Sequence, residues 1–198
     1  MADYGITRDA ALALLREHVK SENLVRHCLA TEAVMRALAR HFGEDEEQWG
    51  LAGLLHDLDI ELTNADLNVH GLEAEKILAA RGIDPVIVDA IKRHNEQAHT
   101  LKRETRLHRA LAAGETITGL VTATTLVYPD KKLASVKAKS IVKRMKEKAF
   151  AASVNRFLSS GAKRSLGATT DNVAMTAPLE PLTGTATEHT PSPCSSMP

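Results

Sequence analysis

The chain is poor in aromatic side chains, which make up only 3% of its 198 residues. Apolar residues nevertheless reach 43%, so a chain of this length can bury a core. Ala and Leu supply most of that apolar content, whereas a β-sandwich would need more aromatic and β-branched residues. The composition therefore favours packed α-helices.

Cysteine is also scarce: Cys28 and Cys194 are far apart in the sequence, which excludes a disulfide framework and favours a reducing, cytoplasmic location. The chain has no run of 18 apolar residues and no basic-then-apolar signal at its start, so neither a membrane span nor a secretory leader is expected. The formal net charge is zero, which gives no indication of a nucleic-acid partner or a membrane surface.

Apolar residues recur every three to four positions along most of the chain, and this period predicts an all-α domain of about six to eight helices. Thr7, Ser21 and Asp84 are expected to cap helices, and Gly43 to end one. No strand pattern of useful length is present. The expected helices span about 8–19, 22–42, 45–57, 70–81, 85–95, 104–127 and 135–149, the last with a further extension to about 159, and 58–69 is an irregular connection.

The composition changes after Gly161. Five of the seven prolines lie between Pro178 and Pro198, among Thr, Ser and Gly. Such a segment cannot bury enough apolar surface to offset the entropy lost on ordering it. We therefore predict one helical domain over 1–160 and a flexible tail over 161–198.

The pair His56-Asp57, at the end of the predicted helix GLAGLLHDLD, is the first sign of chemistry. An imidazole followed by a carboxylate can offer a metal two adjacent ligands of mixed type. His27 lies 29 residues upstream, on the apolar side of its own predicted helix. Each residue alone is more often structural, because a single histidine on an apolar face is usually a satisfied core residue.

Three further polar residues fit the same pattern. His70 opens one predicted helix, His94 closes the next, and Glu115 lies on or beside the apolar face of a long one. A helix cap, a cation at a helix end and a buried ion pair are the alternative roles. Burying all these groups unpaired would cost several kcal/mol, which a shared metal would remove. Five other histidines fit no such pattern and are expected at the surface: His18, His41, His99, His108 and His189.

The arrangement H…HD…D is the signature of the HD superfamily of metal-dependent phosphohydrolases, and the ordered series in this chain resembles the small HDIG-related branch of that superfamily. The resemblance extends over about 21–155. The segments that carry it are LVRHCLATEAVMRALA, WGLAGLLHDLD, HGLEAEKILAARG, IKRHNE, RALAAGETITGLV and YPDKKLASVKAKS.

The resemblance implies which residues bind one or two divalent metals. His27 matches the family's first ligand, and His56-Asp57 matches the HD pair. His70 and His94 match the extra histidines of members that hold two metals, and Glu115 stands in the place of the closing Asp. The implied metal ligands are His27, His56, Asp57, His70, His94 and Glu115.

Two departures from the family pattern affect the expected site. Glu115 stands where the family has Asp, and its extra methylene changes the metal spacing. The motif reads HDLD instead of HDIG, so Asp59 is an additional carboxylate. Asp57 and Asp59 are the expected catalytic residues, with Asp59 positioning a ligand or a water.

Mixed imidazole and carboxylate ligands suit Mn, Fe, Zn or Ni better than Mg. The resemblance implies cleavage of a small phosphoester, such as a nucleotide, by metal-activated water. Two alternatives remain open at this stage. One is a di-iron oxygenase of the HD fold, and the other is a non-catalytic, metal-binding regulatory domain.

A basic segment follows the long predicted helix, with eight Lys or Arg against two acids over 130–148. Most of these lysines are expected to form a solvated face. Lys131, Lys132 and Lys137 are the candidates for binding a phosphorylated substrate at the mouth of the site.

Overall fold

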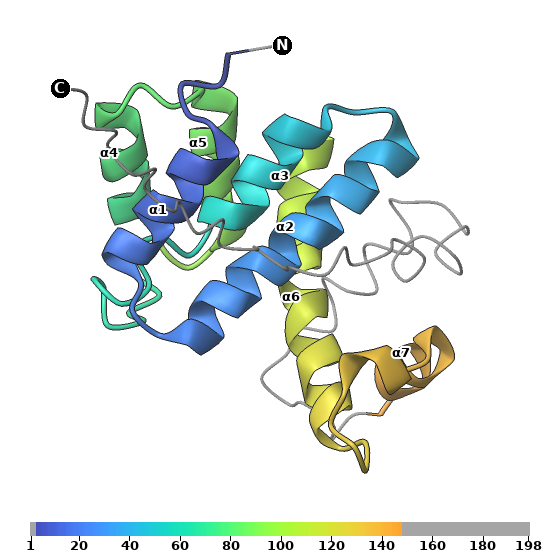
Figure 1. Ribbon diagram of the computed structural model, residues 1–198. Helices are drawn as coiled ribbons and strands as arrows, with labels where there is room; N and C mark the ends of the chain where they lie inside the picture. Colours follow the sequence, from blue (N-terminus) through green and yellow to red (C-terminus); the bar gives the residue numbers. More distant parts are fainter. Residues whose placement is uncertain (1–2, 148–198) are drawn as a thin grey trace, which may run out of the picture.

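A computed structural model describes residues 3–147, and within them every regular element is helical (Figure 1). This confirms the all-α prediction. The predicted tail over 161–198, Cys194, His189 and the proposed extension of the last helix lie outside the described residues. The elements are α1 (Arg8–His18), α2 (Glu22–Phe42), α3 (Glu46–Leu55), α4 (Leu72–Ala80), α5 (Pro85–His94), α6 (Arg106–Leu126), a short 3-10 helix η1 (Leu133–Ser135) and α7 (Ala138–Arg144).

Several helix ends are set by local sequence, as expected. The Thr7 side chain accepts a hydrogen bond from the Ala10 amide, and the Asp84 side chain accepts hydrogen bonds from amides in the first turn of α5. Proline is favoured as the first residue of α5 because an amide hydrogen there would have no partner within the helix. Gly43 ends α2 with φ 67°, a left-handed conformation that glycine adopts without strain. Ser21 precedes α2 but makes no side-chain cap.

Helix α3 forms the centre of the domain. All of its residues from Trp49 to Leu55 are buried, and it packs against α1, α2, α5 and α6. Gly53 lets α2 and α3 come close, because a Cβ there would lie 2.9 Å from the Thr31 carbonyl oxygen. A helix that is apolar all round is expected only at such a position.

The chain between α3 and α4 is folded into tight turns. Helix α3 ends at Leu55, two residues before its predicted end, and α4 begins at Leu72, two residues later than predicted. The amides of Leu58 and Ile60 donate to carbonyl oxygens three residues earlier, whereas a continued α-helix would use carbonyls four residues earlier. These turns carry the HD pair, Asp59 and His70.

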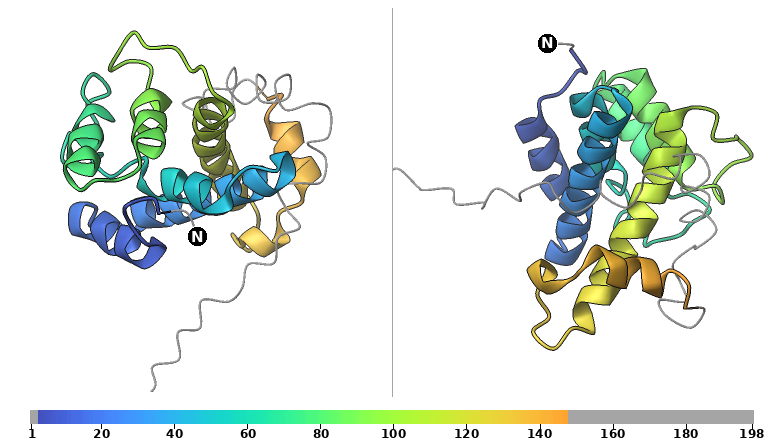
Figure 2. Two further views of the ribbon diagram at one scale, coloured as in Figure 1. Left: turned by 90° about the horizontal axis from the view of Figure 1, so that it is seen from above. Right: turned by 90° about the vertical axis from the view of Figure 1, so that its right-hand side faces the viewer.

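Helix α7 lies on the far side of α6 from α4 and α5 (Figure 2). Its Ile141 forms a small second core with Leu120 and Val136. The predicted helix over 135–149 is shorter within the described residues: α7 begins three residues later, at Ala138, and ends at Arg144, while Ser135 is the last residue of η1. None of the described helices combines the length and the apolar character that a membrane crossing requires.

Candidate metal centre

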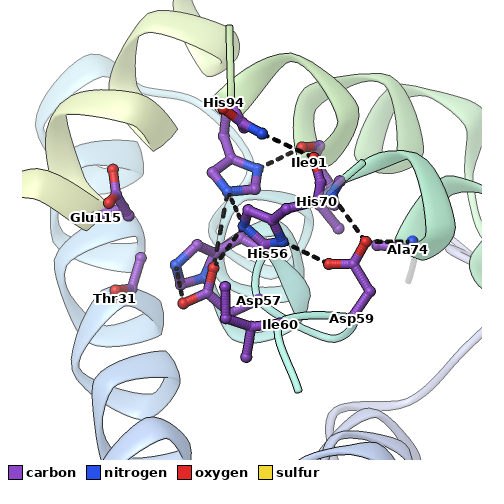
Figure 3. Close-up of polar contacts among 12 residues, drawn as sticks. Thr31, His56, Asp57, Asp59, Ile60, His70, Ala74, Ile91, His94 and Glu115 are labelled. Atoms are coloured by element: carbon purple, nitrogen blue, oxygen red, sulfur yellow. Dashed lines mark hydrogen bonds and ion pairs between the residues drawn. The ribbon is translucent and has the colours of Figure 1, made fainter. Parts of the chain in front are cut away.

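Four helices and the turns after α3 bring the predicted ligands together. His27 comes from the first half of α2, and His56 and Asp57 follow the end of α3. His70 lies two residues before α4, and His94 is the last residue of α5. Figure 3 shows the side chains of His70 and His94 turned toward the HD pair.

The first ligand group consists of His27, His56 and Asp57. The Nε2 atoms of the two histidines are 3.2 Å apart. Oδ2 of Asp57 lies 3.5 Å from Nε2 of His27 and 3.3 Å from Nε2 of His56. The structure therefore brings the ligand atoms of these three predicted residues together.

The second ligand group consists of Asp57, His70 and His94. Here the two Nε2 atoms are 3.0 Å apart. The other carboxylate oxygen of Asp57, Oδ1, lies 3.2 Å from Nε2 of His70 and 3.7 Å from Nε2 of His94. Asp57 thus contributes one oxygen to each group and joins them.

The opposite ring nitrogen of each histidine fixes its orientation. Nδ1 of His56 lies 2.9 Å from the Gly53 carbonyl oxygen, and Nδ1 of His94 bonds the Ile91 carbonyl. Nδ1 of His70 lies 2.7 Å from Oδ1 of Asp59. Carbonyl and carboxylate oxygens only accept, so each of these Nδ1 atoms donates and, in a neutral ring, Nε2 carries a lone pair.

His27 is fixed by a hydroxyl from α6. Its Nδ1 is 3.1 Å from Oγ1 of Thr118, and that hydroxyl is 2.6 Å from the Glu115 carbonyl oxygen. The single hydroxyl proton goes to the carbonyl, so Thr118 accepts from Nδ1. In its neutral form His27 therefore also presents the Nε2 lone pair to the first ligand group.

These contacts fit a bound cation. In neutral rings the facing Nε2 atoms are both acceptors and cannot bond each other. Burial lowers the pKa of His56 to about 3 and that of His94 to about 4, so these two rings stay neutral near pH 7, whereas the raised pKa of His70 lets that ring carry a proton when no metal is bound. Burial alone would raise the pKa of Asp57, but His56 and the other nearby imidazoles hold it well below its usual range. An ionised carboxylate among imidazole lone pairs is suited to a transition metal.

Asp59 is fully buried and supports a ligand instead of lining the open site. Its Oδ1 accepts from His70, and its Oδ2 accepts from the amides of Gly71 and Ala74 at 2.8 and 3.0 Å. Burial would lower the pKa of His70, but hydrogen bonds to Asp57 and Asp59 raise it to about 9. Of the two roles expected for Asp59, this geometry favours positioning a ligand over orienting a water.

A cleft of about 410 Å³ opens beside the ligands, and Glu115 lines it together with Asp57. Glu115 belongs to neither ligand group. Figure 3 shows it on α6, across the site from the labelled imidazoles. Burial and the charge of Asp57 raise its pKa to about 7. The structure thus brings Glu115 to the site without placing it among the three-residue groups.

The structure does not bring Lys131, Lys132 and Lys137 to the cleft. All three are exposed, and none is among the residues that line it. Helix α6 continues seven residues beyond Gly119, the last of its residues to line the cleft, which moves the next turn about 10 Å away. Arg103 lines the cleft instead, and nothing in its sequence context predicted that.

Among the other histidines, His41 is exposed as predicted, and His18 and His99 are half-buried. The surface prediction for His108 was wrong. His108 is buried, completes a capping box with Thr105 at the start of α6, and lies 3.1 Å from Asp89 of α5. Thr105 lies three residues before it, but the usual capping box has Glu or Gln at the position of His108, so the sequence pattern did not point to this role.

A family model for the HD domain matches residues 24–123, which run from α2 through most of α6 and include all six residues predicted as metal ligands. The chain belongs to the HD-domain family. HD domains are generally metal-dependent hydrolases, and the two ligand groups could hold such a metal. No curated protein shows significant similarity to this chain.

Proposed function

We propose that this protein is a phosphohydrolase that cleaves a small phosphoester, with one or two ions of Mn, Fe, Zn or Ni. The shared carboxylate of Asp57 carries the proposal, because it offers one oxygen to each of two groups of imidazoles. A bound divalent ion lowers the pKa of a water molecule and offsets charge on a phosphoryl group. Family membership supports hydrolysis over other uses of the site.

In this proposal, the protein's own residues would orient the imidazoles and bind the metal. Each imidazole is held through its Nδ1 atom so that its Nε2 atom faces inward. The oxygen atoms that hold them belong to Gly53, Thr118, Asp59 and Ile91. We propose Glu115 as a further ligand from the α6 side. Its support is that an ionised, half-buried carboxylate beside Asp57 is unfavourable until a cation is present.

The size of the cleft supports a small substrate. A volume of about 410 Å³ is at the lower end for ligand pockets and suits a molecule such as a mononucleotide. Apolar Ile60 and Leu67 line it together with the polar residues, so an organic group can pack beside the phosphate.

The test is a phosphoester panel on full-length protein that has been stripped by a chelator and reloaded with each metal separately. We expect hydrolysis of one or more phosphomonoesters by at least one metal form. Asp57→Asn should abolish it, whereas Asp66→Asn, which changes an exposed aspartate of the same turns, should not. Metal retention without hydrolysis of any phosphoester would contradict the proposal.

A di-iron oxygenase is the second candidate, favoured by the presence of four imidazoles around one bridging carboxylate. It predicts that the purified protein retains iron and consumes oxygen with an organic substrate. Oxygen uptake by the iron form, with no phosphate release by any metal form, would favour it over hydrolysis.

A further inference from the structure

The cleft contains one strongly basic side chain. Of the described residues that line it, Arg103 alone is an arginine or lysine, whereas Asp57, Glu96 and Glu115 are acidic. An anionic substrate entering this cleft would therefore meet one fixed cation besides any bound metal. The position of Arg103 decides where that attraction acts.

Arg103 is held firmly at the edge of the second ligand group. Its Nε donates to the Arg93 carbonyl oxygen at 3.0 Å, and its Nη2 donates to the carbonyl of His94, whose imidazole belongs to that group. Only 7% of its side chain is exposed. The planar guanidinium is thus fixed beside the ligands, which reduces the entropy lost when it binds an anion.

The third nitrogen of Arg103 has a replaceable partner. Nη1 lies 3.1 Å from Oε1 of Glu96, whose side chain is 58% exposed. An ion pair with one partner largely in solvent is weak, because water screens it. A substrate oxyanion could take the place of the Glu96 carboxylate without disturbing the two backbone contacts of Arg103.

We propose that Arg103 binds a phosphoryl oxygen of the substrate, and that Glu96 competes with the substrate for this cation. The inference rests on the proposed phosphohydrolase function and names its anion-binding residue. Arginine suits this role because its fork of N–H donors matches the oxygens of a phosphoryl group. Since Arg103 touches the His94 backbone, the bound phosphoryl group would lie between Arg103 and the second ligand group.

The test measures binding of inorganic phosphate to manganese-loaded full-length protein by titration calorimetry, together with KM and kcat on the best phosphoester. Arg103→Lys keeps the charge but loses the planar fork, and should weaken phosphate binding about tenfold. Glu96→Gln removes the competing charge, and should tighten phosphate binding roughly two- to fivefold. KM should follow phosphate affinity in both variants.

Arg109→Met is the matched control. Arg109 also donates to backbone carbonyls, those of Arg103 and Glu104, but is exposed and does not line the cleft. Its loss should leave phosphate affinity unchanged. The metal content and melting temperature of every variant should also be measured, because they show whether a variant weakens anion binding itself or weakens metal binding at the second ligand group.

Unchanged phosphate affinity in Arg103→Lys and Glu96→Gln, both with full metal content, would overturn the proposal. Tighter binding in Glu96→Gln would support it, because a merely structural role for Arg103 predicts no gain. Acetate titrated in place of phosphate tests the class of anion, and Arg103-dependent binding of acetate alone would overturn the phosphoryl assignment. Phosphate binding that depends on Arg103, in a protein that hydrolyses no phosphoester, would refute the proposed reaction and leave the anion site in place.

Discussion

Asp59 and His70 form a buried pair in which Nδ1 of the imidazole donates to Oδ1 of the carboxylate at 2.7 Å. The other oxygen of Asp59 is held by two backbone amides at the start of α4. The carboxylate therefore cannot turn away, and it fixes the direction in which Nε2 of His70 points. A supporting contact of this kind sets the affinity of the ligand it orients.

Asp59→Asn should weaken metal binding at the second ligand group about 10- to 100-fold, because one amide oxygen cannot serve three donors. The first ligand group does not contact Asp59 and should keep its metal. Elemental analysis at buffered free-metal concentrations measures both. Asp66→Asn, on an exposed residue, is the control, and equal stoichiometry in Asp59→Asn and wild type would refute the positioning role.

The shared carboxylate makes a distinct prediction about stoichiometry. His56→Ala should remove metal from the first ligand group alone, and His94→Ala from the second alone. Asp57→Asn should weaken both, because each group uses one oxygen of Asp57. Metal titration followed by elemental analysis of the three variants tests this. Wild-type metal content in His56→Ala would contradict the first ligand group.

Glu115→Gln keeps the shape of the side chain and removes its charge. A ligand role predicts weaker metal retention and lost activity, whereas Glu115→Asp should retain metal with altered turnover. A purely structural role predicts instead a lower melting temperature with unchanged metal content. Full metal and full activity in the Gln variant would exclude Glu115 from the site.

Gly53→Ala should destabilise the domain by about 1–3 kcal/mol, because the added Cβ would lie 2.9 Å from the Thr31 carbonyl oxygen in a packed core. For a chain of this size, that lowers the melting temperature by roughly 2–4 °C per kcal/mol. Gly114→Ala is the matched control, since its Cβ would meet only side-chain atoms, the Met35 sulfur at 3.3 Å and Val34 Cγ1 at 3.4 Å, and no backbone atom. Equal melting temperatures for the two variants would contradict the close approach of α2 and α3.

The two tyrosines should titrate separately. Burial and a hydrogen bond to Asp45 raise the pKa of Tyr4 to about 12, so its phenol stays neutral well above pH 10. A hydrogen bond with Ser140 and nearby cations lower the pKa of Tyr128 below its usual value of 10. Absorbance at the phenolate band should therefore rise in two steps as pH increases, and Tyr128→Phe should remove the step at lower pH. A single step for wild type would contradict these environments.

Local sequence determined most of the helices and indicated which residues are the candidate ligands. A helix repeats hydrogen bonds four residues apart, so caps such as Thr7 and Asp84 and the apolar period are sufficient to locate it. The HD pair and the distant histidines were recognisable because imidazole and carboxylate side chains are costly to bury without a shared partner.

Tertiary structure decided which partners those side chains meet. Thr118 orients His27 from 91 residues away, and Arg103 reaches the cleft because it bonds the end of α5. Neither contact leaves a periodic trace in the sequence, because the first depends on how α2 and α6 pack and the second on the path of the irregular connection between α5 and α6. The basic residues after α6 show the converse: their charge was evident from the sequence, but the length of α6 carries them away from the cleft.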